Sequence, residues 1–116
     1  MNIEEVRTYC LSKNRVTEDF PFDQNTLAFK VCGKIFCLTD VEELPLKINL
    51  KCDPDYAIEL REQFAAIMPG YHMNKKHWNT ICVTDIANST FVKSLIDHSY
   101  DLVVSGLTKK LRDQLK

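Results

Sequence analysis

The stretch Leu46-Lys47-Ile48-Asn49-Leu50-Lys51-Cys52 runs directly into Asp53-Pro54. Apolar and polar side chains alternate strictly from Leu46 to Cys52, which is the pattern of a β-strand with one buried and one solvent-exposed face. Aspartate followed by proline is a strong start for a helix, because the carboxylate caps free N–H groups and proline suits the first helical position. The stretch therefore predicts a half-exposed strand that leads at once into a helix over residues 54–64.

A β-hairpin is predicted upstream of this strand. Residues 26–31 and 34–39 are both rich in β-forming side chains, and only Cys32-Gly33 separates them. Two intervening residues, one of them glycine, favour a tight turn. The resulting register would pair Val31 with Lys34, Phe29 with Phe36 and Leu27 with Leu38. It would also place Cys37 on the opposite face of the strand from Phe36.

Capping residues and helical periodicity predict the other helices. These helices cover residues 2–13, where Asn2 and Glu5 resemble a capping box; a long segment from Asn88 or Ser89 to Gly106; and a short segment that Thr108 caps. The remaining segments are interpreted as a connection at residues 16–24, extended chain at 67–73 and a strand at 78–83. Because short turns join the strands, this order predicts an α+β fold, with a largely antiparallel sheet and helices packed on one face, in a single domain over residues 1–116.

Composition excludes several classes of protein. The 116 residues carry 15 Lys+Arg and 16 Asp+Glu, a formal net charge of −1, and 45% of them are hydrophobic. This is enough apolar material for a packed core, which argues against intrinsic disorder. No uncharged stretch is long enough for a membrane span, and the acidic start is unlike a signal peptide. The five cysteines are odd in number and include no CxxC pair, so reduced thiols in the cytoplasm are expected.

The most unusual segment is Pro69-Gly70-Tyr71-His72-Met73-Asn74-Lys75-Lys76-His77-Trp78-Asn79-Thr80. It interleaves basic, amide and aromatic side chains, a combination suited to phosphate contacts and base stacking. In the alternative interpretation, Tyr71 and Trp78 anchor the sheet while Lys75 and Lys76 form a solvated turn. The sequence leaves both interpretations open, together with the question of whether Trp78 is buried or exposed.

Lysines are the only charged residues on the first three predicted strands, at positions 30, 34, 47 and 51. The acids lie mostly in predicted helices and turns, so the sheet face without helices would be lysine-rich and would attract phosphates. Scattered lysines at sheet edges can also serve only to keep a sheet from aggregating. The near-neutral net charge favours this second interpretation, since dedicated nucleic-acid-binding domains are usually strongly basic.

No cofactor, metal site or catalytic group is expected. The three glycines form no phosphate-binding loop, and His72 and His77 lie five residues apart with no carboxylate between them. Nothing in the sequence orients His77 as a base toward Cys82. The neighbours Asp97-His98-Ser99 would point in different directions around a helix, so they predict no catalytic triad.

The segment at residues 69–80 resembles the hallmark segment of the YjbR/MmcQ family of small bacterial proteins. The resemblance covers essentially the whole chain, including Phe20-Pro21-Phe22, the hairpin at residues 27–38, Lys51-Cys52-Asp53-Pro54 and Ser99-Tyr100-Asp101-Leu102-Val103. It implies a CyaY-like (frataxin-like) α/β sandwich with a double-wing arrangement, and members of the family are described as predicted DNA-binding proteins. Frataxin-like iron binding is not carried over, because the first predicted helix has only two acids, Glu4 and Glu5.

The sequence thus predicts a small cytoplasmic DNA-binding module, monomeric or weakly dimeric, with no enzymatic activity and no cofactor. The residues expected to bind nucleic acid are Lys30, Lys47, Lys51, Lys75 and Lys76 on phosphates, His72, Asn74, His77 and Asn79 on bases or sugars, and Trp78 as a stacking platform. The alternative is a protein- or small-ligand-binding module in which residues 71–79 form a specificity loop beside a concave pocket.

Overall fold

The computed structural model describes residues 1–70 and 73–115. Its centre is a six-stranded antiparallel sheet in the order β1-β2-β3-β4-β6-β5. The strands are β1 (Val16–Asp19), β2 (Thr26–Val31), β3 (Lys34–Asp40), β4 (Lys47–Lys51), β5 (Ile67–Pro69) and β6 (Trp78–Cys82). The helices are α1 (Ile3–Leu11), α2 (Pro54–Gln63), α3 (Ser89–Ser105) and α4 (Lys109–Asp113), with a 3₁₀ turn at Val83–Asp85. The α+β fold with a largely antiparallel sheet is therefore confirmed.

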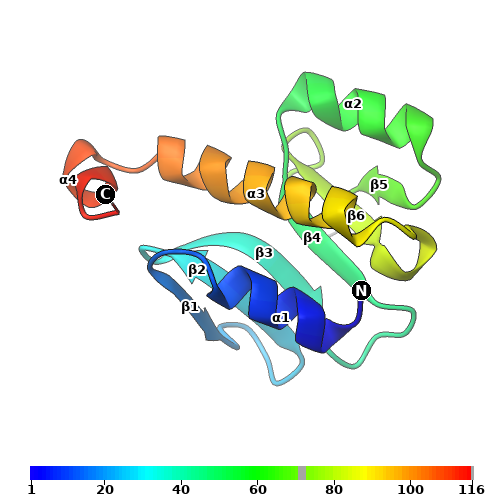
Figure 1. The fold of residues 1–116 in the computed structure, drawn as a ribbon, viewed down its shortest axis with the longest axis horizontal. Coiled ribbons are helices and arrows are strands. Elements are labelled where there is room, and N and C mark those ends of the chain that lie inside the picture. The colour runs from blue at the N-terminus through cyan, green and yellow to red at the C-terminus, as the bar shows by residue number, and fades with distance from the viewer. Residues whose placement is uncertain (71–72, 116) are drawn as a thin grey trace.

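One face of the sheet carries the helices. Figure 1 shows α1 and α3 lying across the sheet and α2 beside β5 and β6, while α4 projects at the end of α3. Helices and strands share one apolar core, to which α3 contributes Val92, Leu95, Ile96 and Val103, and α2 contributes Ala57 and Leu60. The helix-facing side chains of the strands include Phe29, Ile48, Leu50 and Ile81, each at most 1% exposed. Helices on one face are what the alternation in residues 46–52 predicts.

The predicted helix starts are present. Asn2 and Glu5 form a reciprocal capping box at α1. The Asp53 side chain accepts a hydrogen bond from the Tyr56 N–H group, and Pro54 occupies the first turn of α2. Asn88 and Thr108 cap α3 and α4 in the same way. Local side-chain chemistry therefore determines where each helix begins.

Two features differ from the sequence-based expectation. The segment interpreted as a connection contains β1, a four-residue strand that pairs with β2 at the edge of the sheet. In the hairpin, Val31 pairs with Lys34 as predicted, but a β-bulge shifts the register so that Phe29 lies opposite Cys37. Phe36 and Cys37 consequently both reach the helix-side core, and the predicted placement of Cys37 on the other face was wrong. A bulge adds one residue to one strand, which is enough to reverse the facing of everything after it.

The two turn residues of this hairpin have positive φ angles, 49° at Cys32 and 80° at Gly33. This is the geometry of a type I′ turn, which matches the twist of the two strands and favours asparagine or glycine at both positions. Among the residues that the structure describes, no helix combines the length and the apolar character needed to cross a lipid bilayer.

Candidate nucleic-acid interface

Strand topology gathers basic side chains at one end of the sheet. In an antiparallel sheet the end of one strand lies beside the start of the next, so Val31, Lys34, Lys51 and Trp78 share one end. Arg15 immediately precedes β1, whose first residue pairs with Val31. The turn that carries Lys75 and Lys76 leads into β6 at the same end.

The short helix α4 adds to this end. The Asn14 side chain donates a hydrogen bond to the Leu115 carbonyl oxygen over 2.7 Å, and the Asn14 carbonyl accepts one from the Tyr100 hydroxyl. These bonds hold Leu115, two residues beyond α4, beside the chain that enters β1. We define the basic end as Arg15, Lys34, Lys51, Lys75, Lys76, Lys109, Lys110 and Arg112. All eight are exposed except Lys51, which is half-buried.

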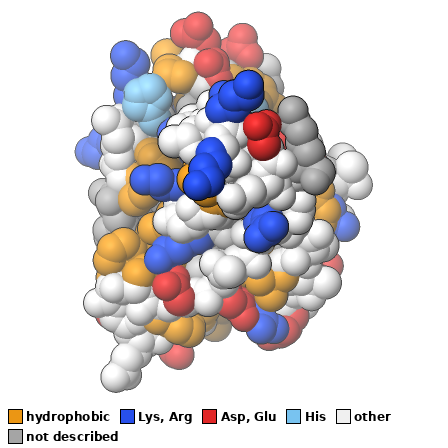
Figure 2. Space-filling view, turned by 90° about the vertical axis from the view of Figure 1, so that its left-hand side faces the viewer, with side chains coloured by type: hydrophobic (Ala, Val, Ile, Leu, Met, Phe, Trp, Pro, Cys, Tyr) orange, Lys and Arg blue, Asp and Glu red, His pale blue; other side chains and the backbone are white. Residues whose placement is uncertain are grey.

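The cations of the basic end have no carboxylate partner among the described residues. The salt bridges between described side chains involve other cations: Arg7 with Glu18, Lys13 with Asp97, Lys30 with Asp19 and Lys47 with Glu43. Figure 2 looks onto the end of the molecule that carries α4. It shows Lys and Arg side chains across the middle of this surface, with most Asp and Glu side chains toward its upper and lower margins. A local excess of positive charge therefore exists on a chain of near-zero net charge.

The turn before β6 is built by hydrogen bonds to its backbone. The Asn74 side chain accepts a bond from the Lys76 N–H group, and the Asn74 carbonyl accepts bonds from His77 and Trp78. Gly70 is needed beside this turn, because a Cβ at that position would lie 3.0 Å from the Trp78 Cβ. The result is a compact turn that exposes Lys75 and Lys76 to solvent.

Arg61 holds this turn against α2. Its Nε donates a hydrogen bond to the Asn79 Oδ1 over 2.8 Å, and its second terminal nitrogen donates to the carbonyl oxygens of Lys75 and Trp78. The sequence analysis did not identify Arg61, since one charged residue in a surface helix has the same pattern whether it contacts solvent or a neighbouring loop. Its only local signal is its place in the last turn of α2.

The structure separates the ten residues expected to bind nucleic acid. Lys51, Lys75 and Lys76 belong to the basic end, whereas Lys30 and Lys47 are engaged with Asp19 and Glu43, each over 3.1 Å. Two of the four lysines predicted on the open face are therefore paired with acids. Beneath Lys47 this face also contains a buried polar chain, in which the Thr80 hydroxyl bonds Asn49 and the Asn49 amide bonds the Leu38 carbonyl.

The amide and aromatic residues of the segment are mostly structural. Asn79 is 1% exposed and faces α2, so its side chain does not reach an external ligand. Its Nδ2 has no hydrogen-bond partner in the described structure. Trp78 is 9% exposed, which answers the question that the sequence left open in favour of a buried side chain. Asn74 shapes the turn, His77 is half-buried, and the expectation for His72 falls outside the described residues.

The structure does not bring together His77 and Cys82, the reactive pair considered from the sequence. His77 and Cys82 lie at opposite ends of β6, about 17 Å apart by the rise of a strand. Burial, together with the neighbouring Asp53 carboxylate, raises the pKa of the Cys52 thiol to about 11. The His98 Nε2 accepts a hydrogen bond from the Asp53 N–H group over 3.1 Å, and its ring meets Tyr56 edge-on.

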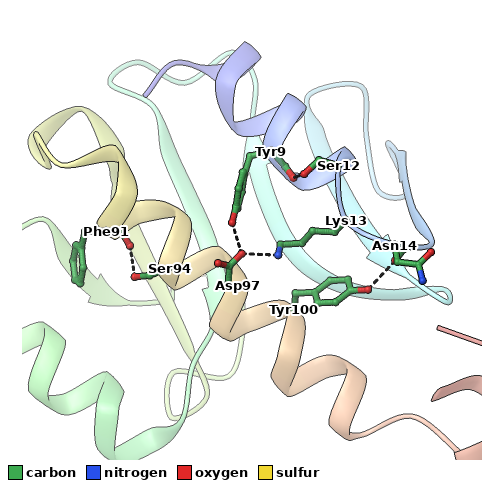
Figure 3. Close-up of polar contacts among 8 residues, drawn as sticks. All are labelled: Tyr9, Ser12, Lys13, Asn14, Phe91, Ser94, Asp97 and Tyr100. Carbon is green, nitrogen blue, oxygen red and sulfur yellow. Dashed lines mark hydrogen bonds and ion pairs between the residues drawn. The ribbon is translucent and has the colours of Figure 1, made fainter. Parts of the chain in front are cut away.

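The three neighbours Asp97, His98 and Ser99 point to three different elements, as expected from their helical positions. Asp97 accepts hydrogen bonds from Tyr9 and Lys13 of the α1 region, a junction that Figure 3 shows between α1 and α3. His98 faces the start of α2, and Ser99 is fully buried against β3 and β4. These contacts link α3 to the α1 region, to the start of α2 and to the sheet.

Comparison with known proteins places this geometry in a family. The chain is 41% identical over 96 residues to the uncharacterized protein YbdF of Escherichia coli O157:H7, covering 82% of this chain and 76% of YbdF. It is 30% identical over 116 residues to the uncharacterized protein YjbR of Escherichia coli K12, covering 99% of this chain and 98% of YjbR.

Solved structures agree. A Deinococcus radiodurans protein, DR2400, described as a DUF419 domain, superimposes with a TM-score of 0.91 at 38% identity, over 98% of this chain and 87% of that one. A Pseudomonas syringae protein superimposes with a TM-score of 0.76 at 27% identity, over 88% of this chain and 98% of that one. The sequence model of the YjbR family matches residues 11–102. The chain therefore belongs to the YjbR family.

Proposed function

We propose that this protein is a DNA-binding module that contacts the phosphate backbone through its basic end, and that it is a binding protein rather than an enzyme. The observation that carries the proposal is the convergence of eight cations, from five separate segments of the chain, with no carboxylate partner among the described residues. Unpaired cations on one surface are the feature that phosphates recognise, because binding releases the counterions condensed on nucleic acid.

The contacts at the basic end are suited to phosphates more than to bases. Lysine and arginine supply charge without base specificity unless they enter a groove, and Asn79 and Trp78 are buried. Lys75 and Lys76 stand on a turn whose backbone is held by Asn74 and Arg61, so less order has to be gained on binding. The proposal retains Lys51, Lys75 and Lys76 from the sequence-based set and adds Arg15, Lys34 and the cations of α4.

The proposal predicts a defined dependence on salt. Anisotropy of labelled duplex and single-stranded DNA would be measured between about 50 and 200 mM salt, where each phosphate contact contributes about 0.9 to the slope of log affinity against log salt. The double variant K75Q/K76Q is expected to make that slope shallower by about two. K30Q is the matched control, because Lys30 already pairs with Asp19 and should leave the slope nearly unchanged.

Arg61 is expected to act by positioning the turn. If so, R61Q should weaken binding in the wild-type background and have no further effect in the K75Q/K76Q background, because both changes remove the same contacts. Additive effects of R61Q and K75Q/K76Q would instead make Arg61 an independent phosphate contact.

Absence of binding to both DNAs at about 50 mM salt would refute the proposal, because electrostatic binding is strongest at low salt. Equal effects of K30Q and K75Q/K76Q would contradict the location of the site. Either result would favour the alternative in which the protein binds a protein or a small ligand.

A further inference from the structure

The end of the sheet opposite the basic end carries acidic and exposed apolar side chains. Two loops lie there, residues 20–25 between β1 and β2 and residues 41–46 between β3 and β4, and the Val41 N–H group bonds the Asn25 carbonyl across them over 2.9 Å. Figure 1 shows both loops at the lower edge of the sheet, away from α4. They display large apolar side chains to solvent: Phe20 is 47% exposed, Phe22 67% and Leu44 87%.

These apolar side chains stand among acids. Residues 16–29 contain Glu18, Asp19 and Asp23, residues 35–46 contain Asp40, Glu42 and Glu43, and neither range contains a lysine or arginine. Three cations from outside these ranges pair with Glu18, Asp19 and Glu43. Asp23 accepts hydrogen bonds from the backbone of Asn25 and Thr26, which lower the pKa of its carboxyl group and keep it ionised. We define the acidic end as residues 18–25 and 40–44.

Exposed apolar side chains grouped within a polar rim mark interaction surfaces. Among the large apolar side chains described as exposed, only Ile58 lies elsewhere, on α2. A cavity of about 460 Å³ opens beside Phe20 and is lined by Ile3, Arg7, Leu27 and Val41 among others. Carboxylates and aromatic faces both attract ammonium and guanidinium groups, so the fitting partner is a surface rich in lysine and arginine.

The same chain carries such a surface. We propose that the acidic end of one copy binds the basic end of a second copy, in a head-to-tail association. The charges of the two ends are complementary, they lie at opposite ends of the same strands, and a net charge of −1 leaves little overall repulsion between copies. An interface between two different surfaces is heterologous and does not close a dimer, so chains of copies would grow with concentration.

This inference rests on the geometry of the two ends and does not require DNA binding. It adds one consequence if DNA does bind: the next copy and DNA would compete for the basic end. The association would then be limited to the protein that is free of DNA.

Sedimentation of the purified protein without DNA tests the proposal, because the monomer has a mass of 13.4 kDa. The average mass should rise with concentration at about 50 mM salt, and the association constant should fall at least tenfold by about 300 mM, where charges are screened within a few ångströms. A mass that stays at the monomer value at every concentration tested would overturn the proposal.

A mixing experiment distinguishes head-to-tail association from a symmetric dimer. The variant F22S/L44S loses the acidic-end anchors, and the variant K34E/K75E/K110E loses the basic end. Neither should self-associate, but an equimolar mixture should form a heterodimer, since each variant retains the end that the other lacks. No heterodimer in the mixture would overturn the proposal.

I58S is the matched control, because it removes an exposed apolar side chain outside the acidic end. I58S should leave the association constant unchanged. An effect as large as that of F22S/L44S would show that the association is nonspecific hydrophobic contact, and it would refute the inference. Circular dichroism of each variant would verify that it is folded. All the substituted positions are exposed, including Lys34 at the start of β3.

Discussion

Ser99 joins α3 to two strands, and its replacement by alanine is predicted to destabilise the fold strongly. The side chain is fully buried. Its hydroxyl donates a hydrogen bond to the Phe36 carbonyl of β3 and accepts one from the Lys51 N–H group of β4 over 2.9 Å. Phe36 is the residue that the bulge takes out of register with β2, and Lys51 is the last residue of β4. One hydroxyl thus satisfies two backbone groups at irregular points of the sheet.

The size of the effect follows from these two partners. S99A leaves a buried carbonyl and a part-buried N–H group without partners. The loss costs about 1–3 kcal/mol for the carbonyl and about 1–1.5 kcal/mol, the low end of that range, for the N–H group. Alanine recovers about 0.5 kcal/mol through its better helix propensity. The expected loss in the free energy of unfolding is therefore about 2–4 kcal/mol. Urea denaturation followed by Trp78 fluorescence would show the midpoint falling by about 1–2 M, given ordinary m-values for a small domain.

S94A provides the matched control on the same helix. The Ser94 hydroxyl donates to the Phe91 carbonyl one turn earlier, as Figure 3 shows, and Ser94 is exposed to solvent. Its removal should change the free energy of unfolding by less than about 0.5 kcal/mol. A loss below about 1 kcal/mol for S99A, or equal losses for the two variants, would refute the argument from stranded backbone groups.

Three further outcomes are expected. C32N should raise the free energy of unfolding by about 1 kcal/mol in chemical denaturation, because asparagine tolerates the left-handed turn before Gly33 better than cysteine does. The hydrogen bond to Asp97, followed by burial, raises the pKa of Tyr9 to about 12; the folded state therefore holds this proton more tightly, and a pH series of unfolding curves should show stability present below pH 10 and lost as the pH rises toward 12. In the native protein at neutral pH, Ellman's reagent should modify half-buried Cys32 first, and Cys52 only on unfolding, because burial raises the pKa of Cys52 to about 11 and limits access.

Local patterns in the sequence predict most of the fold. Helix starts depend on one capping side chain and its neighbours, so Asn2, Asp53, Asn88 and Thr108 indicate them correctly. The alternation at residues 46–52 correctly identifies β4, since a strand repeats every two residues. The prediction that its second face is exposed was wrong at Asn49, which is 8% exposed because its side chain bonds Thr80 and the Leu38 carbonyl. These elements are therefore determined mainly by their own residues and close neighbours in the sequence.

The features that the sequence analysis missed depend on distant partners. The short strand β1 has two acids among four residues, and it is stabilised as a strand by pairing with β2 and by the Arg7–Glu18 ion pair. The bulge near Phe36 is compensated by Ser99, 63 residues later. Neither β1 nor the bulge leaves a periodic signal in its own segment, because in each case the stabilising contact comes from elsewhere in the fold.

Lys47 and Lys51 show why the site was only partly predictable. Both lie on β4 and point to the same face, so the sequence treats them as equivalent phosphate contacts. They are the first and last residues of β4, so they lie at opposite ends of the strand. Lys47 forms a salt bridge with Glu43 from the preceding loop. Lys51 lies opposite Trp78 at the other end of the strand, and no described acid forms a salt bridge with Lys51. Charge in this fold is thus sorted by strand end rather than by sheet face. For that reason K51Q should reduce the salt slope of DNA binding by about one, and K47Q should leave it nearly unchanged.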